Sequence, residues 1–307
     1  MIKKDYPLVS VVVVTYNSEK TIFETLESIK NQTYKNLELI ISDDCSKDNT
    51  VEICKQWLIK NNKSFINVQI VESSKNTGIS GNCNRGYKVA NGTWIKGIAG
   101  DDLLMEDCIE NNINYVLNNN KSKIILSKTA LIGESYKINK YKNLFNYGAL
   151  NLNKKNLLYL LLVDNFVPAS TLFIKKEIFI QLGGFDERMP LLEDWPFWIK
   201  ALHNNINLSF NNEFTIYYRV SESSISLSSN PNPLYIKSIN YFLNNYLPKY
   251  QWKTNKLLWV YYKVYQYRNN KRIIIRIISS LLLYINPIYH YIKIIKNKAN
   301  KLNKSFL

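Results

Sequence analysis

Two pairs of adjacent carboxylates stand where strands or helices are expected to begin or end. Asp101-Asp102 follows the apolar run 94–99, so both side chains would project from the end of a buried strand. Hard cations such as Mg²⁺ or Mn²⁺ take carboxylate oxygens as ligands and share their shell with a diphosphate. The pair is therefore a candidate metal site, in which a cation would stabilise the charge on a departing diphosphate. Taken alone, two aspartates also fit a solvated turn or a helix N-cap.

The second pair, Glu193-Asp194, precedes an aromatic stretch that begins at Trp195 and is expected to start a helix. A carboxylate held against apolar and aromatic neighbours has a raised pKa, which suits a general base acting on a sugar hydroxyl. The other interpretation is a helix cap, with an acidic residue in the first turn to complement the helix dipole. The pair alone leaves both interpretations open.

A third acidic stretch, residues 43–48, ends a predicted strand and opens a predicted helix. Asp48 is expected to cap that helix. Asp44 could also accept a hydrogen bond from the imide N–H of a uracil or thymine ring. The two roles are compatible, since helix caps and ligand loops often coincide at strand ends.

Residues 76–86 are polar and contain Gly78, Gly81 and Gly86, which predicts a loop that a helix follows. Glycine lets the backbone approach a ligand closely, and a helix N-terminus favours anions. By itself, however, such a segment is equally typical of an ordinary surface loop.

The elements that must position these residues follow from the hydrophobic periodicity. Apolar strand-like runs at 9–15, 37–42, 68–71 and 94–99 alternate with helical stretches whose apolar residues are three or four apart. This alternation predicts an α/β fold with a mostly parallel sheet flanked by helices. The polar clusters fall at the carboxyl ends of the strands, which is the edge where open α/β sheets bind ligands. Beyond Ser127 the alternation loosens.

The composition restricts the kinds of site that the chain can build. The four cysteines form no close CxxC pair and only His203 and His290 are present, so a zinc-type site is not expected. No secretory signal precedes the first strand-like run, which indicates a reduced, cytosolic chain.

The net charge of +16 is concentrated at the C-terminal end. No Asp or Glu follows Glu222, whereas 14 Lys and Arg do, and residues 230–233 read as a linker to a helical, aromatic and basic region. Arg276 and Pro287 break the apolar run near 273–285, which leaves it too short to span a bilayer. We therefore expect this region to lie on an anionic membrane surface. The alternative is a helical hairpin that packs on the α/β domain with a solvated basic face.

Together, and in this order, these segments resemble the family 2 glycosyltransferases, which have the GT-A fold, over about residues 7–226. The family's strand ending in Thr-Tyr-Asn is matched by residues 11–17, and its Asp-Asp-x-Ser-x-Asp stretch by residues 43–48. Its glycine-bearing loop is matched at 76–86, its metal motif at 101–102, and its Gly-Gly-Phe-Asp and Glu-Asp motifs at 183–186 and 193–194. The combination supports the resemblance where no single motif does.

The resemblance implies roles for individual residues. Asp194 would be the catalytic base, and Asp102, with Asp101, would hold the metal. The residues implied to border the acceptor are Pro168, Ala169, Glu193 and Trp195. The residues implied to contact the nucleotide are Thr15, Tyr16, Asn17, Glu19, Asp43, Asp44, Asn76, Gly78, Asn84, Arg85 and Asp101.

The chain departs from the family pattern at several positions. Many members have an arginine where this chain has Cys83, so phosphate contacts would fall to Arg85 or to another group. Many have an additional Asp where this chain has Ala99, and a histidine often stands at the position of Ser221. The Gln-x-x-Arg-Trp signature of processive polysaccharide synthases is missing, which favours the addition of a single sugar.

The resemblance implies an inverting glycosyltransferase that uses a UDP- or dTDP-linked sugar, Mg²⁺ or Mn²⁺, and a glycan or lipid-linked glycan acceptor. Family analogy indicates surface-polysaccharide synthesis, such as capsule or O-antigen, by a cytoplasmic protein peripheral to the inner face of the bacterial cell membrane. We expect a nucleotide-sugar-binding half at 1–127, an acceptor-binding half at 128–228 and a membrane-associating region at 229–307.

Two other functions compete with this hypothesis. An inactive scaffold would bind the nucleotide sugar without turnover, although the retained Asp44, Asp102 and Asp194 argue against it. A basic nucleic-acid-binding protein would need a reading element, and here the charge lies outside the α/β region. No nucleic acid partner is therefore expected.

Overall fold

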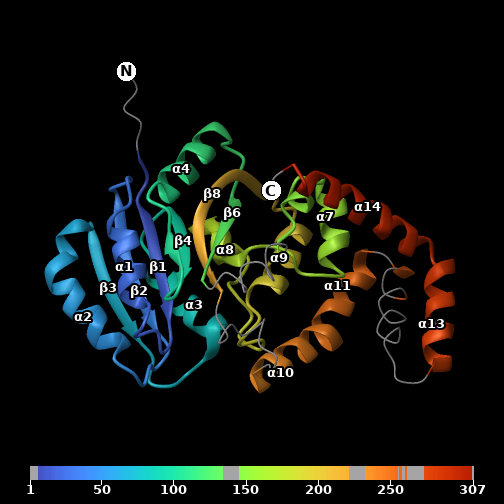
Figure 1. Ribbon diagram of the computed structural model, residues 1–307, viewed down its shortest axis with the longest axis horizontal. Coiled ribbons are helices and arrows are strands. Elements are labelled where there is room, and N and C mark those ends of the chain that lie inside the picture. Colours follow the sequence, from blue (N-terminus) through green and yellow to red (C-terminus); the bar gives the residue numbers. More distant parts are fainter. Residues whose placement is uncertain are drawn as a thin grey trace.

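One mixed sheet of eight strands runs through the part of the chain that the structure describes (Figure 1). A computed structural model describes residues 6–133, 145–220, 232–254, 256–257, 260 and 273–305. The strand order is β3-β2-β1-β4-β7-β6-β8-β5. The strands are β1 (Val9–Thr15), β2 (Leu37–Asp43), β3 (Asn67–Glu72), β4 (Trp94–Ala99), β5 (Leu103–Leu104), β6 (Ile124–Gly133), β7 (Phe173–Lys175) and β8 (Leu208–Val220).

The first four strands are parallel and confirm the predicted α/β pattern. Each of them agrees with an apolar run of the sequence to within one residue at either end. The chain passes from β1 outward to β2 and β3, and then returns to β4 on the other side of β1. The carboxyl ends of β1 and β4 therefore flank a topological switch point, where α/β sheets bind ligands.

The sheet becomes mixed beyond β4, which explains why the sequence alternation loosens there. β7 is antiparallel to both β4 and β6, while β6 and β8 are parallel to each other. The boundary predicted at residue 127 falls inside β6, and strands from both sides of it belong to the same sheet. The boundary predicted at residue 228 lies outside the described residues.

Alternate residues of the central strands face two separate cores. Val11 and Val13 of β1 pack in a core that also contains α1 (Ile22–Lys30), α2 (Thr50–Asn61) and α4 (Cys108–Asn118). Val12, between them, belongs to the other core, with α3 (Gly78–Val89) and the helices of the second half. Both faces of β1 are therefore apolar, as expected of a parallel strand that helices cover on both sides.

The prediction of a loop at residues 76–86 is wrong for most of its length, because α3 begins at Gly78. This helix packs directly on the sheet, and a Cβ at Gly86 would lie 2.5 Å from Cγ1 of Val12. The glycine at 86 thus serves close helix–sheet packing. Gly78, with a φ of +81°, turns the chain into the helix.

The remaining helices belong to the second half and the C-terminal region, apart from the short η1 (Asn62–Ser64) after α2. The second half contains α6 (Tyr147–Leu150), α7 (Lys154–Leu161), η2 (Ala169–Thr171), α8 (Lys176–Gln181) and α9 (Asp194–His203). The C-terminal region contains α10 (Pro233–Tyr241), the π-helical η3 (Phe242–Tyr246), α11 (Leu247–Thr254), α13 (Ile273–Ile285) and α14 (Pro287–Asn303). Pro233 occupies the first turn of α10 and Asn232 caps it, so the predicted linker ends where this helix begins.

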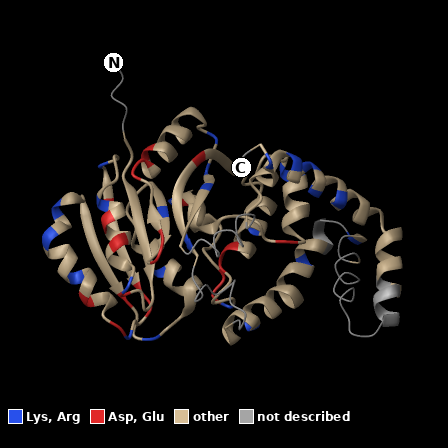
Figure 2. Cartoon of the chain, in the orientation of Figure 1, with Lys and Arg blue, Asp and Glu red and all other residues tan. Residues whose placement is uncertain are grey.

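α14 packs on the second half, as the hairpin alternative for the basic tail requires. Its buried side consists of Ile288, Ile292, Ile295 and Ala299. Tyr291 donates its hydroxyl to Oδ1 of Asn156 in α7 at 2.6 Å, and the Asn146 amide donates to Oδ1 of Asn300 at 2.9 Å. Figure 2 shows lysines along the rest of α14, where the exposed ones include Lys293, Lys298 and Lys301.

Gly148→Ala tests how tightly α14 docks. A Cβ at Gly148 would lie 2.1 Å from the carbonyl oxygen of Ala299 and 2.3 Å from the backbone nitrogen of Asn303, so the two helices would have to separate. We expect a loss of about 1–3 kcal/mol in the free energy of unfolding, measured by urea denaturation. Lys298→Ala, on the exposed side of α14, is the control. Equal stability of the two variants would contradict this packing.

Candidate active site

The loops after β1 and β2 hold each other through hydrogen bonds. Asn17, with a φ of +52°, donates its backbone N–H to Oγ of Ser46 at 2.8 Å. Asp43 accepts both the N–H and the hydroxyl of Ser46, at 2.9 and 2.5 Å. Glu19 accepts a backbone N–H of the β2–α2 loop at 3.1 Å. Three residues with an implied nucleotide role are thus brought together. Their polar atoms fix the shape of the corner that the loops after β1 and β2 form.

Asp44 is buried at the same corner, and its carboxylate is fully hydrogen-bonded. It accepts the N–H and hydroxyl of Thr77, the Gly78 N–H and Nη2 of Arg85, all at 2.6–2.8 Å. Asn76 supports the same turn by accepting the Gly78 N–H at 3.1 Å. Side chains donate to Oδ1 of Asp44 and backbone groups to Oδ2, so only Oδ1 has donors that can rotate away for a ligand.

Thr15 ends β1 with a hydroxyl that is buried and has no hydrogen-bond partner. The hydroxyl faces Gly100, where a Cβ would come within 3.0 Å of it. Because β4 ends at Ala99, this atom lies at the switch point between β1 and β4. Buried polar atoms are nearly always paired, so this hydroxyl is a candidate contact for a ligand.

Asp101 and Asp102 follow β4; Asp102 is buried, so it is not the solvated turn residue of the alternative, while Asp101 is half-buried in a turn. Burial raises the pKa of both carboxyls, and the charge of Asp101 raises that of Asp102 further. Arg219 donates its backbone N–H to Oδ1 of Asp102 at 2.9 Å, while its guanidinium pairs with Glu24 at 2.6 Å. Arg219 thus favours the ionised form of both carboxyls, whereas burial opposes it.

This donor set fits Mg²⁺ or Mn²⁺, which prefer carboxylate oxygens. Among the residues that the structure describes, no group of three or more His, Cys, Asp and Glu could hold a metal ion. Oxygens of a diphosphate and of water would have to complete the coordination shell, which is the usual arrangement for Mg²⁺.

Asp194 lies in the first turn of α9, so the helix-start interpretation of this pair describes its backbone correctly. Asn165 donates its amide to Oδ2 of Asp194 at 2.9 Å, and the Trp195 N–H donates to Oδ1 at 2.6 Å. Burial raises the pKa of Asp194, and burial followed by the charge of Asp194 raises the pKa of Glu193 to about 8. Glu193 therefore keeps its proton at neutral pH.

Tyr218 of β8 lies within electrostatic reach of both acidic pairs. Burial raises the pKa of its hydroxyl, and the charges of Asp102, Asp101, Asp194 and Glu193 raise it further. The next residue of β8 is Arg219, which holds Asp102 through its backbone. Both pairs therefore lie near Tyr218, one after β4 and the other at the start of α9.

The turn expected to border the acceptor is tied to β4 by a buried lysine. Pro168 is buried, and Ala169 begins the turn η2. Lys96 of β4 is fully buried, and its ammonium donates to the carbonyls of Ser170 and Gly97 at 2.5 and 2.6 Å. Burial lowers the pKa of Lys96 to about 8. This contact fixes the turn relative to β4, the strand that Asp101-Asp102 follow.

Asn84 and Trp195 have partners that give them positioning roles. Asn84 exchanges hydrogen bonds with the backbone of Phe185, at 2.9 and 3.0 Å, and so holds the Gly183-Gly184 turn. Trp195 donates its indole N–H to a carbonyl of α7 at 2.6 Å, and its ring packs on Phe242 with centroids 4.6 Å apart. The polar side-chain atoms of Asn84 and Trp195 are hydrogen-bonded within the protein, whereas the hydroxyl of Thr15 is not.

The motifs of the site also relate the chain to known proteins. The sequence model of glycosyl transferase family 2 matches residues 10–183, which is more than half of the chain. That range includes the parallel strands, Asp44 and the Asp101-Asp102 pair. The chain belongs to glycosyltransferase family 2.

Relatives of this glycosyltransferase come from archaea and bacteria. It is 27% identical over 226 residues to an uncharacterised glycosyltransferase of Methanocaldococcus jannaschii, over 73% of this chain and 74% of that one. It is 29% identical over 228 residues to WfaP of Escherichia coli, a UDP-Glc:alpha-D-GlcNAc-diphosphoundecaprenol beta-1,3-glucosyltransferase, over 71% and 80% of the two chains. Some relatives are longer, and the match spans 31% of a Rickettsia felis glycosyltransferase.

Solved structures support the GT-A fold. S. aureus TarS 1–349 in complex with UDP-GlcNAc aligns with a TM-score of 0.56 at 18% identity, over 97% of this chain and 91% of that one. The mannosyltransferase PcManGT from Pyrobaculum calidifontis, in complex with GDP-Man and Mn²⁺, aligns with a TM-score of 0.53 at 14% identity, over 98% and 88%. At these identities the likeness concerns the fold alone.

Glu193→Gln should change how the stability of this glycosyltransferase depends on pH. An unfolded glutamate loses its proton near pH 4.5, whereas folded Glu193 keeps it to about 8. Between these values the folded state binds the extra proton, so wild-type stability falls as pH rises. Glutamine does not titrate. The free energy of unfolding of the variant, relative to that of the wild type, should therefore rise by roughly 1 kcal/mol per pH unit in this window.

Urea denaturation at pH 5, 6.5 and 8 measures this difference. Glu106→Gln, at an exposed position, is the matched control and should follow the wild type. A difference between Glu193→Gln and the wild type that stays constant from pH 5 to 8 would show that the pKa of Glu193 is not raised.

Proposed function

We propose that this enzyme transfers a single sugar, with inversion, from a UDP- or dTDP-linked donor to a glycan or lipid-linked glycan of the bacterial surface. The proposal is carried by the match to family 2 together with two acidic pairs near Tyr218, one after β4 and one at the start of α9. Sugar transfer needs a cation at the departing diphosphate and a base at the attacking hydroxyl. The Asp101-Asp102 pair suits the first task, and Asp194 of the other pair suits the second.

The corner between β1 and β2 would hold the nucleoside. A base imide would bind Oδ1 of Asp44 in place of the Thr77 hydroxyl or Arg85, whose guanidinium would then donate to a base carbonyl. The unpaired hydroxyl of Thr15 would gain a partner. Tyr16, which is 46% exposed, offers a ring face to the base. The names of WfaP and of the TarS complex, with UDP-Glc and UDP-GlcNAc, support a uridine donor.

Asp102 and Asp101 would hold Mg²⁺ or Mn²⁺ beside the donor diphosphate. When bound, the cation supplies positive charge against the charge that develops on the departing group. The chain's own contribution is orientation, since the Arg219 N–H fixes one oxygen of Asp102. The Mn²⁺ complex of PcManGT supports the use of a metal.

Asp194 would act as the general base. The Asn165 amide and the Trp195 N–H hold its two oxygens, so the carboxylate has a fixed direction. It would take the proton of the acceptor hydroxyl while that oxygen bonds to the anomeric carbon. The bond from this carbon to the diphosphate oxygen breaks on the opposite face, its electron pair leaves with the diphosphate, and the configuration inverts. Glu193 is protonated at neutral pH and would not compete for the proton.

The acceptor would lie beside η2 and the start of α9, bordered by Pro168, Ala169, Glu193 and Trp195. WfaP is named for a sugar acceptor linked to diphosphoundecaprenol. We extend this class to the present enzyme and propose an acceptor sugar that carries a diphosphate and a lipid. The absence of the Gln-x-x-Arg-Trp signature favours one transfer per acceptor.

Nucleotide binding and turnover can be tested separately with two variants. In thermal denaturation, UDP with Mn²⁺ should raise the melting temperature of the wild type more than UDP alone. Asp102→Asn should lose the part of this rise in melting temperature that depends on Mn²⁺, because the proposed direct ligand of the metal is gone. Asp194→Asn should keep the full UDP–Mn²⁺ shift and lose turnover of a UDP-sugar by at least about 100-fold.

Full activity in Asp194→Asn would refute its role as the base. Glu106→Gln serves as the exposed acidic control and should retain both binding and turnover. A wild type that binds UDP–Mn²⁺ yet turns over no UDP-sugar with any membrane extract as acceptor would favour the scaffold function instead.

We also propose that α13 rests on an anionic membrane surface. Ile278, Leu281, Leu282 and Ile285 are 51, 63, 46 and 74% exposed, and their spacing places them on one helix face. Leu283, on the opposite side, is 2% exposed. No helix in the described ranges has both the length and the hydropathy to cross a bilayer. An exposed aliphatic face in a region with 14 basic and no acidic residues after Glu222 favours an anionic lipid surface.

Leu281→Glu tests this contact, with Ile180→Glu as the control. Both side chains are 63% exposed aliphatics, but Ile180 lies on α8. Leu281→Glu should weaken co-sedimentation with phosphatidylglycerol vesicles by about tenfold or more, since burying one such side chain is worth roughly 1.5–3 kcal/mol. Equal binding by the two variants would contradict the proposed face.

A further inference from the structure

The indole ring of Trp198 is buried in α9 with its polar atom unpaired. Trp198 is 0% exposed and is among the largest fully buried side chains of the protein. Its Nε1 is also buried and forms no hydrogen bond within the part of the chain that the structure describes. A buried N–H without an acceptor costs free energy, and phenylalanine would place an aromatic ring in the same core without that cost. The N–H of Trp198 therefore calls for an explanation.

The geometry of α9 directs this N–H toward Asp194. The two residues are four positions apart in the helix, so their side chains lie on the same face. Side chains of a helix lean toward its N-terminus, which brings the indole back over the first turn. The N–H also lowers the pKa of the Asp194 carboxyl, as a donor close to a carboxylate does. The acceptor within reach of this unpaired donor is thus the proposed base.

Asp194 has two other donors, yet its surroundings oppose its ionised form. The Asn165 amide and the Trp195 N–H donate to its two oxygens. Burial nevertheless raises its pKa. A general base must be ionised before the acceptor hydroxyl arrives, so each further donor to the carboxylate enlarges the active fraction of the enzyme. A donor that folding has already removed from water can act without giving up hydration at that moment.

The charges around Asp194 decide how its ionisation depends on pH. Among the described residues, the titratable groups that face it are Glu193, Tyr218 of β8 and Tyr235 of α10. Burial, and then nearby carboxylates, raise the pKa of both tyrosines, so both are uncharged at neutral pH. Two groups of α3 that face Glu193 are uncharged as well, because burial raises their pKa values, namely Cys83 and Tyr87. Glu193 is thus the group that can titrate alongside Asp194, and it is unchanged in every variant below.

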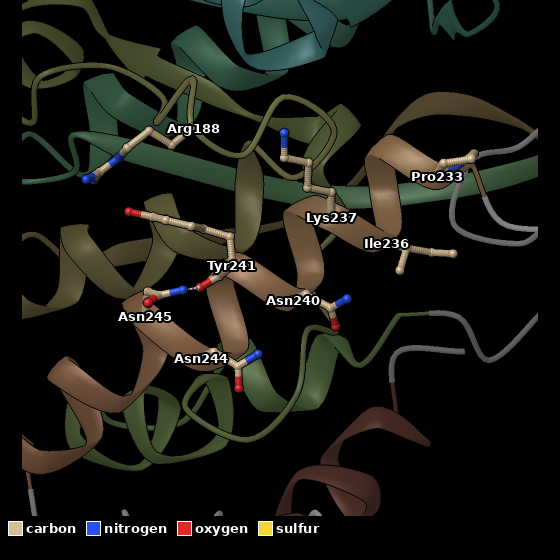
Figure 3. Close-up of a pocket in the computed structure, with 8 residues that line it drawn as sticks. All are labelled: Arg188, Pro233, Ile236, Lys237, Asn240, Tyr241, Asn244 and Asn245. Atoms are coloured by element: carbon tan, nitrogen blue, oxygen red, sulfur yellow. Dashed lines mark hydrogen bonds between the residues drawn. The ribbon is translucent and has the colours of Figure 1, made fainter.

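Two cations near α10 line the exposed side of that helix instead. Arg188 and Lys237 border a hollow of about 480 Å³ there (Figure 3). Against the effect of burial, the donors that lower the pKa of Asp194 are neutral, the Asn165 amide first and then backbone N–H groups and the indole of Trp198. The base therefore depends on neutral donors for its charge.

We propose that the Trp198 N–H is a third donor to Asp194, which makes Trp198 a positioning residue for the base. The proposal rests on the proposed function, in which Asp194 takes the proton of the acceptor hydroxyl. The contact is strongest while Asp194 is ionised and weakens once it is protonated. Trp198 thus holds the charged form ready and limits the directions that the carboxylate can take.

Trp198→Phe keeps an aromatic ring in the core and removes the N–H. Because the donor favours the ionised carboxylate, its loss should raise the pKa of the base. The acid limb of kcat/KM, measured for UDP-sugar transfer to a membrane extract, should move up by about one pH unit. Activity below that limb should fall about tenfold and should largely recover at higher pH.

Trp57→Phe is the matched control for this pH profile. Trp57 is also buried and donates its indole N–H to a carboxylate oxygen of Glu27 at 2.6 Å, but it lies on α2, outside the site. Its variant should keep the acid limb of the wild type. If Trp198→Phe lost the same fraction of activity at every pH, Trp198 would only pack the core, and the proposal would be overturned.

The indole N–H resonances of the tryptophans give a readout that needs no turnover. The Trp198 resonance is assigned through its backbone, so this measurement does not depend on the folding of Trp198→Phe. In Asp194→Asn its proton should move upfield, because a contact with a charged carboxylate becomes one with a neutral amide. The Trp57 resonance is the internal control and should stay in place.

The two measurements separate the possible failures. A Trp198 resonance that does not move in Asp194→Asn would overturn the contact, whatever the activity of the enzyme. A wild type that transfers no sugar would refute the proposed function, and the resonance would still decide whether Trp198 donates to Asp194.

Discussion

Negative charge gathered at the carboxyl edge of a buried sheet is the constraint on which this molecule depends. One acidic pair follows β4 and the other starts α9, and burial raises the pKa of each carboxyl. Such repulsion destabilises a fold and is kept where activity requires it. The surrounding contacts are mainly neutral donors, including the Arg219 N–H and the Asn165 amide. They fix the direction of the carboxyl groups without bringing a full positive charge to them.

The parallel half of the fold could be predicted because its strands are apolar on both faces and end in polar clusters. The prediction for Asp48 was one residue off, because Asn49 is the N-cap of α2, while Asp48 accepts the Thr50 N–H at 3.0 Å. The segment 76–86 was mistaken for a loop because glycine is read as flexibility, whereas Gly86 here permits contact between α3 and β1. Composition cannot distinguish these two uses of glycine.

Several residues of the site left no signal in the sequence. Asn165 is one of many asparagines, and only the fold brings its amide to Asp194, 29 residues away. Lys96 interrupts an apolar strand, which would ordinarily argue against burial, yet backbone carbonyls surround its ammonium. Asn17, Asp43 and Glu19, which were implied to contact the nucleotide, lie together in the structure. Their hydrogen bonds to neighbouring loops depend on backbone positions that one sequence does not reveal.

The unpaired hydroxyl of Thr15 has a consequence for selectivity. Folding has already removed water from this atom, so a ligand that meets it loses only its own hydration. A ligand without a matching polar group leaves the atom as unsatisfied as before and gains nothing from the contact. If the proposed function holds, the Thr15 hydroxyl at the end of β1 would favour nucleotides that bring a matching polar group to it.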